Sequence, residues 1–363
     1  MKVGRAREAA VDWVTRYARV RPDFRGAYVT GSTLALERDA DLAPTSDVDV
    51  VVLVDRAEAP PKPGKLEHRG ALLEVTYEPW STVVSPETVL GDYHRAGPFV
   101  RDCVLADPTG RLALLRERVA RDFADRFWVR RRCAQAEERV RDGLGALDAA
   151  APFHEQVTAW LFPTGVSAHV LLVAALRNPT IRLRYPAARE VLSDFGRLDL
   201  YPALLDSLGC ARLPARVVRR HLATLAETFD ATAGTARTPF PFSSDLTARA
   251  RPIAVAGGAA LIADGLHREA VFWIVATLAR CHTALAADAP HEHARRWPAF
   301  AGVLADLGIH TPADLRRRAR STVRDLLPRV SAAAEEIRAA HPGIRGRGGH
   351  PPLTTSDGSS AVM

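Results

Sequence analysis

The run Asp-Val-Asp-Val-Val-Val-Leu-Val-Asp at residues 47–55 constrains the fold more than any other segment. Its centre is apolar and mostly β-branched, which is typical of a strand buried on both faces. Further strands are predicted at residues 26–30, 71–79 and 100–107, with an amphipathic helix over 5–20 and a shorter helix over 33–39. The first part of the chain is therefore predicted to form a small mixed sheet with flanking helices.

After the turn at residues 107–110 the pattern becomes almost entirely helical. Helices are predicted at 111–122, 126–147, 155–176, 187–195, 202–208, 216–229, 268–286 and 313–340. The predicted fold class is α+β, with a sheet domain at 1–110 and an all-helical domain at 111–342. Residues 343–363 are rich in glycine, serine and proline and are predicted to be a disordered tail.

Composition indicates an ordinary globular protein. Of its 363 residues, 47% are apolar and 25% are charged, which provides enough apolar surface for a sizeable core. The longest apolar runs, at 170–176 and 270–279, are well short of the roughly 20 residues that a membrane helix needs. No apolar stretch of a secretory signal follows the first residues, so we expect a cytoplasmic protein without a membrane partner.

The charge and the cysteines narrow the choice of ligand. The net charge of +7 suits an anionic ligand such as a nucleotide, and it is also compatible with nucleic acid, which is not favoured. Only three of the 49 basic residues are lysine, which we attribute to coding bias, so arginine clusters carry little weight. The four cysteines lack the spacing of a zinc site and are expected to be buried free thiols.

The residues that indicate chemistry lie around the predicted central strand. Asp47 and Asp49 are two apart, so their carboxylates project to the same side and would repel each other without a divalent cation such as Mg²⁺. Gly31 and Ser32 fall at a predicted strand-to-helix turn, where backbone N–H groups and a hydroxyl can approach a phosphate. Glu74 on the next strand can supply a third carboxylate, as a metal ligand or as a proton acceptor.

This arrangement of Gly31-Ser32, a spacer, Ser46-Asp47-Val48-Asp49 and a later acid resembles the minimal nucleotidyltransferase domains of the DNA polymerase β superfamily. With its helical second half, the chain is most similar to bacterial antibiotic nucleotidyltransferases of the aminoglycoside type. The resemblance implies that Ser32 and Ser46 contact the β- and γ-phosphates and that Asp47 and Asp49 bind Mg²⁺. It also implies that Glu74 is the general base. Fourteen residues separate Ser32 from Asp47, slightly more than is usual in the family.

The function implied by the resemblance is Mg²⁺-dependent transfer of a nucleoside monophosphate, AMP from ATP, to a hydroxyl of a small molecule such as an aminoglycoside. The acceptor is expected to lie between the two domains. Two alternatives stay open: the same chemistry on a protein or an RNA, as in toxin or antitoxin systems, and a domain that binds nucleotide without catalysis. Neither the acceptor nor the oligomeric state can be read from the sequence.

Several other residues are further candidates for the site. Glu78 is a second choice for the third carboxylate. Glu269 and Arg268, at the start of an apolar helix, are candidates to bind the acceptor, and any of Arg177, Arg182 and Arg184 can meet a triphosphate. The Arg216–His221 spacing matches helical nucleases only weakly, and residues 291–293 (His-Glu-His) near Asp288 are predicted to be a solvated helix start.

Overall fold

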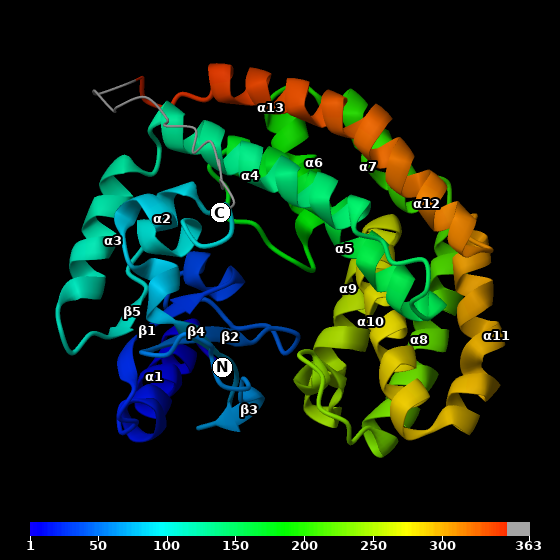
Figure 1. Cartoon of the computed structure of the whole chain (residues 1–363), viewed down its shortest axis with the longest axis horizontal. Coiled ribbons are helices and arrows are strands. Elements are labelled where there is room, and N and C mark those ends of the chain that lie inside the picture. The colour runs from blue at the N-terminus through cyan, green and yellow to red at the C-terminus, as the bar shows by residue number, and fades with distance from the viewer. Residues whose placement is uncertain (347–363) are drawn as a thin grey trace, which may run out of the picture.

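The computed structural model describes residues 1–346 and has a sheet unit beside a helical unit (Figure 1). The α+β fold class is confirmed. The sheet has the strand order β3-β4-β2-β1-β5. Strand β2 is parallel to β4, and the other three neighbouring pairs are antiparallel. The strands are β1 (Phe24–Thr30), β2 (Val48–Val54), β3 (Gly64–His68), β4 (Ala71–Pro79) and β5 (Val104–Ala106).

Strand β3 was not predicted, because the prolines just before it and the glycine at its first position favour a loop. It begins at Gly64 and pairs with β4 as one side of a hairpin whose turn contains Arg69 and Gly70, both at positive φ. The hairpin adds an edge strand to the buried strands β2 and β4. The helices of the sheet unit are α1 (Val3–Trp13), α2 (Pro86–Gly91) and α3 (Arg111–Asp122).

The predicted helix over residues 33–39 is wrong. Only a 3-10 turn forms there, at Ser32–Ala35. The carbonyls that a helix would use bind α1 instead: Arg7 donates to the carbonyl of Thr33, and the N–H of Gly4 donates to that of Arg38. The phosphate site proposed from the sequence therefore lacks the dipole of a helix.

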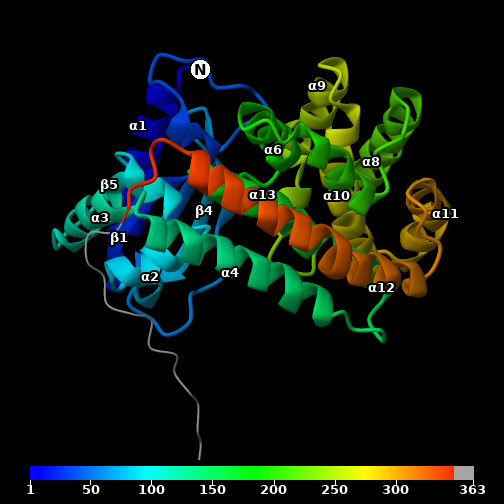
Figure 2. The ribbon, with the colours of Figure 1, turned by 90° about the horizontal axis from the view of Figure 1, so that it is seen from above.

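Helix α4 (Arg126–Gly145) runs from the sheet unit into the helical unit, and α13 lies alongside it (Figures 1 and 2). The apolar core of the sheet unit includes α3 and extends to Trp128, whereas Val129 already belongs to the core of the helical unit. The change of core thus falls inside α4, later than the predicted boundary at residue 110.

The helical unit is built around α5 and α10. Both are long and apolar enough to cross a membrane, but 78% and 72% of their most apolar windows are buried inside the protein. The predicted helix at 313–340 is divided into α12 and α13 by one π-helical turn, and neither α9 nor α11 was predicted. The helices are α5 (Phe153–Ala174), α6 (Arg184–Asp194), α7 (Tyr201–Leu208), α8 (Ala215–Thr235), α9 (Gly257–Ala263), α10 (His267–Asp288), α11 (Pro290–Asp306), α12 (Pro312–Ser321) and α13 (Leu327–Ala340).

The last described residues return to the sheet unit. Ile344 is buried, and the backbone of Arg345 exchanges hydrogen bonds with Ala124 and Arg126 near the start of α4. In the predicted tail, Ile344 and the backbone of Arg345 are therefore ordered against the rest of the protein, and residues 347–363 of that prediction lie outside the described residues.

Candidate active site

The strand register brings the predicted acids together. Thr30, Asp49, Glu74 and Lys65 are successive partners across β1, β2, β4 and β3. Asp47 directly precedes β2, and one carboxylate oxygen from each of Asp47, Asp49 and Glu74 lies within 4.8 Å of the others. Glu78, the alternative third acid, pairs with Arg95 in the segment that follows α2 and does not line the same cavity. The choice of Glu74 over Glu78 as neighbour of the two aspartates therefore agrees with the geometry.

Gly31 is required both by its backbone conformation and by the space beside it. Its φ is +77°, in the region that favours glycine, and a Cβ there would lie 1.7 Å from Oδ2 of Asp49. The turn that carries Ser32 therefore packs directly against Asp49, one of the metal ligands predicted from the sequence. Ser32 and Ser46 both line the cavity in front of the carboxylates.

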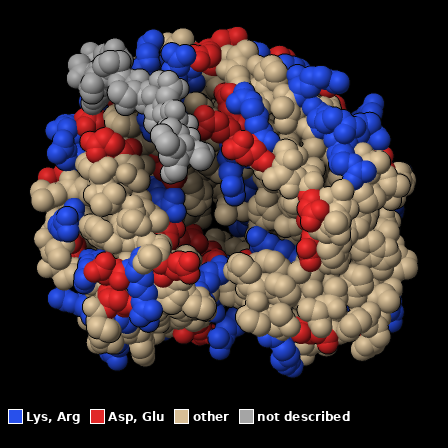
Figure 3. All heavy atoms as spheres, viewed as in Figure 1, with Lys and Arg blue, Asp and Glu red and all other residues tan. Residues whose placement is uncertain are grey.

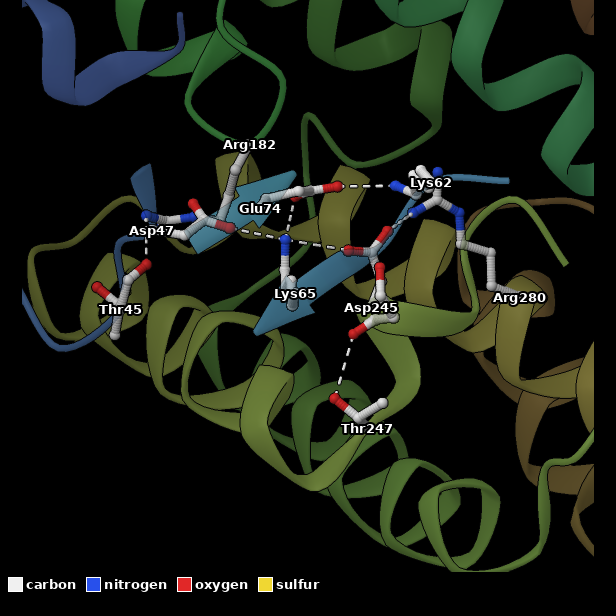
Figure 4. A network of polar contacts seen from close by, with 10 residues as sticks. Thr45, Asp47, Lys62, Lys65, Glu74, Arg182, Asp245, Thr247 and Arg280 are labelled. Carbon is white, nitrogen blue, oxygen red and sulfur yellow. Dashed lines mark hydrogen bonds and ion pairs between the residues drawn. The ribbon is translucent and has the colours of Figure 1, made fainter. Parts of the chain in front are cut away.

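A lysine that sequence reasoning missed lies among the carboxylates. The ammonium of Lys65 is 2.6 Å from Oδ2 of Asp47 and 3.2 Å from Oδ1 of Asp245, and it also contacts Oε2 of Glu74 (Figure 4). The amine of Lys62 is 2.8 Å from the other oxygen, Oε1, of Glu74. Both oxygens of Glu74 thus accept hydrogen bonds from lysines.

Glu74 and Asp49 differ in the direction of their pKa shifts, because the lysines contact Glu74 and not Asp49. Burial raises the pKa of Glu74, but Lys65 and Lys62 outweigh burial and hold that pKa at about 2. Burial and the negative charges of Asp47 and Glu74 raise the pKa of Asp49 well above its ordinary value. Burial lowers the pKa of Lys65, yet Asp47, Asp245 and Glu74 together raise it, so the ammonium stays charged. The surroundings of Asp49 therefore disfavour its charged form, and a cation bound beside it would favour that form.

The helical unit contributes the fourth carboxylate. A 3-10 turn at Ser243–Leu246 approaches β3 so closely that a Cβ on Gly64, whose φ is +71°, would lie 2.3 Å from Cβ of Ser244. This contact brings Asp245 to Lys65. Arg280 of α10 holds the other oxygen of Asp245 at 3.0 Å, and the Arg280 guanidinium lies over the rings of Phe162, Phe242 and Trp273.

The carboxylates lie in a cavity of about 310 Å³ between the two units. The space-filling view shows a hollow between the two halves, with acidic and basic side chains around it (Figure 3). From the sheet unit the lining includes Gly31, Ser32, Ser46 and the acids. The helical unit adds residues 178–183, Asp245, Ile253, Trp273 and Arg280.

Some predicted site residues lie elsewhere. Glu269 is buried and accepts a hydrogen bond of 2.6 Å from the hydroxyl of Tyr201, while Arg268 donates to the carbonyl of Ala211 at 2.8 Å. Neither lines the cavity, because the first turn of α10 packs against α7 and the segment that follows it. The expectation that these two residues bind the acceptor is therefore corrected.

Of the three arginines that flank the helix break, only Arg182 lines the cavity, where it donates to the carbonyl of Thr45 at 3.4 Å. Arg184 is buried against Phe272, and Arg177 pairs with acids of α6. The nuclease match at Arg216 and His221 forms no site, since His221 is buried and bonded to Asp306 while Arg216 is exposed. In the His-Glu-His segment, His291 is exposed at the start of α11 and His293 packs against other aromatic rings.

The residues that were missed carried one sequence signal. Two of the three lysines in the chain, Lys62 and Lys65, are in this site, in a protein that uses arginine almost everywhere else. Asp245 and Arg280 carried no comparable signal, because only the tertiary contact between β3 and the 243–246 turn brings them to the sheet.

The chain was also compared with known proteins. No family model matches it, and no curated protein does either. The argument for function therefore depends on the site itself.

Proposed function

We propose that the protein is a Mg²⁺-dependent nucleotidyltransferase that transfers AMP from ATP to a hydroxyl group. The observation that carries the proposal is the set of three carboxylates, Asp47, Asp49 and Glu74, beside the Gly31-Ser32 turn in one cavity. The choice of ATP rests on the resemblance alone.

The carboxylates fit a magnesium ion. Asp49 is half-buried beside the negative groups of Asp47 and Glu74: in the described part of the chain its carboxylate has no hydrogen bond or ion pair, and its pKa is raised. One oxygen of Asp47 is also left after its bond to Lys65. Mg²⁺ is commonly held by one or two carboxylates together with substrate phosphates, so Asp47 and Asp49 are the proposed ligands. Bound there, the ion would neutralise charge on the phosphates as it develops.

The other residues of the cavity bind and orient the reactants. Ser32 and Ser46 are proposed to donate to the β- and γ-phosphates, with Arg182 as the nearest guanidinium. The acceptor oxygen forms a bond to the α-phosphorus, the bond from that phosphorus to the bridging oxygen breaks, and pyrophosphate leaves. Positioning and charge supply most of the catalysis in such transfers.

Glu74 receives a different role from the general base that the resemblance implies. Both of its oxygens are bound by ammonium groups, and its pKa of about 2 makes it a weak proton acceptor. We assign it the task of holding Lys62 and Lys65, and the proton of the acceptor hydroxyl passes to water. Glu74 is then a positioning residue.

The charges in the cavity also bear on the acceptor. A polycationic aminoglycoside needs free carboxylates, but both oxygens of Glu74 and both oxygens of Asp245 already have cationic partners. Trp273 and Ile253 add an aromatic and an aliphatic surface to the helical side. A hydroxylated acceptor that is neutral or anionic fits this wall better than an aminoglycoside.

The test is pyrophosphate release from ATP and Mg²⁺ with panels of cationic, neutral and anionic hydroxylated compounds, with Asp49→Asn as the inactive control. We expect release with a neutral or anionic class and none with the control. Release with proteins or RNA alone would favour the toxin or antitoxin alternative. Calorimetry that finds no binding of ATP with Mg²⁺ would contradict the proposed function itself.

A further inference from the structure

The ammonium of Lys65 is enclosed by anions on three sides. Its oxygen partners come from Asp47 at the start of β2, Glu74 on β4 and Asp245 in the turn of the helical unit. The side chain is only 5% exposed. A cation held by carboxylates from three separate elements has the surroundings of a coordinated metal ion rather than those of a surface ion pair.

The way in which the carboxylate oxygens are shared leaves room for one divalent ion. Lys62 and Lys65 take both oxygens of Glu74, and Lys65 and Arg280 take both oxygens of Asp245. Lys65 also takes Oδ2 of Asp47. What is left is one oxygen of Asp47 and the carboxylate of Asp49, a pair that suits one Mg²⁺ completed by phosphates and water.

Sites that use two metal ions hold them about 3.5–4 Å apart and share a carboxylate between them. At this sheet edge Asp47 is the carboxylate that can be shared, because it contacts Lys65 and has an oxygen within 4.8 Å of one from Asp49. A second ion on the Glu74 side of Asp47 would need the oxygens that Lys65 already binds.

We propose that Lys65 takes the place of a second metal ion, so that the site works with one divalent cation and one fixed ammonium. This inference rests on the proposed function. The ammonium contacts Asp47, Glu74 and Asp245, while the single metal ion would serve the triphosphate. Asp245, which is itself bound by Arg280, holds Lys65 there, which makes the contact between the two units part of the site.

The experiment counts bound Mn²⁺ by electron paramagnetic resonance, in the full-length protein, with an ATP analogue that cannot release pyrophosphate. We expect one Mn²⁺ per chain in the wild type. Lys65→Met removes the ammonium and frees oxygens of Asp47, Glu74 and Asp245, so we expect two. Lys62→Met is the matched control, because among the described residues Lys62 has an ion pair with Glu74 alone, and this variant should still bind one Mn²⁺.

Each outcome of this experiment either supports or overturns the inference. Two Mn²⁺ in the wild type would show that Lys65 yields its position to a metal ion and would overturn the inference. A single ion in a folded Lys65→Met variant, or none, would overturn it as well. The proposed function itself fails if the wild type binds the ATP analogue without Mn²⁺, or binds neither the analogue nor Mn²⁺. This result differs from the two outcomes that overturn only the inference about Lys65. Thermal unfolding verifies that each variant folds, and the wild-type count stands alone if Lys65→Met does not fold.

Discussion

Buried cations are compensated in two different ways in the two halves of this molecule. At the sheet edge, Lys65 is surrounded by carboxylates, and the carboxyl group of Asp49 is left without a cationic partner among the described residues. In the helical unit, Arg184 is 2% exposed but bonds to the carbonyl of Ile181 at 2.8 Å and lies over the ring of Phe272. Carbonyls and rings offer only partial charges, and Nη1 of Arg184 is buried without a hydrogen-bond partner among the described residues. Excess carboxylate, by contrast, marks a place that needs a ligand.

The largest effect should come from removing the carboxylate of Asp49. Asp49→Asn should lower turnover by about 10³-fold or more, since it removes a proposed magnesium ligand. Pyrophosphate release measures the effect, and circular dichroism verifies the fold. Asp55→Asn, at the exposed end of β2, is the control and should retain activity. If Asp49→Asn had activity near that of the wild type, the carboxylates at the sheet edge would not mark a ligand site, and the contrast with the helical unit would be lost.

On the other side of the comparison, Arg184→Met should affect stability and not metal binding. It leaves the carbonyl of Ile181 without its donor and loses the contact with Phe272, so the free energy of unfolding should fall by about 2–4 kcal/mol. Urea unfolding measures this change. Arg189→Met, on an exposed position of the same helix, should be nearly neutral. A loss of Mn²⁺ binding in folded Arg184→Met would mean that the helical-unit cation also belongs to the site.

Glu74→Gln sharpens the roles within the site. Glutamine keeps one oxygen for a lysine but loses a charge, so we expect turnover to fall by about tenfold, with the KM for ATP little changed. A general base would show a loss of about 10² or more. Steady-state kinetics distinguishes the two, and a loss in the larger range would restore the proton-acceptor role to Glu74.

The smallest effect concerns the histidines of the helical unit. Burial, and the neighbouring His293, lower the pKa of His282 to about 3 and that of His154 to about 4. Because these folded values lie below the ordinary value of about 6.5, their contribution to stability is complete above pH 6.5 and is lost as the pH falls towards 4. The melting temperature should fall by roughly 5 °C or more over that range. His282→Phe should flatten the dependence, and an unchanged slope in this variant would contradict the assignment.

Much of the fold was predictable from local patterns, and so was half of the site. The β-branched run after Asp47 and the helical periodicities after residue 110 are properties of single segments, so the class and most elements follow from them. Asp47, Asp49 and Glu74 follow from strand alternation. Lys65 and Asp245 do not, because β3 starts after prolines and forms only by pairing with β4, and Asp245 reaches the sheet only by a contact between units. The prediction that Glu269 binds the acceptor was wrong because a polar pair at the start of a helix can face a neighbouring helix as well as a cavity.

Helix α4 has a mechanical consequence. It spans the two cores without a break, and the backbone of Arg345 fastens the end of the described chain to its first turn. A continuous rod with its near end clamped resists bending, so the two walls of the cavity cannot swing apart as on a flexible hinge. In the proposed function, the width of the opening is then a fixed dimension, and it would select an acceptor by its size before any contact with the reacting groups.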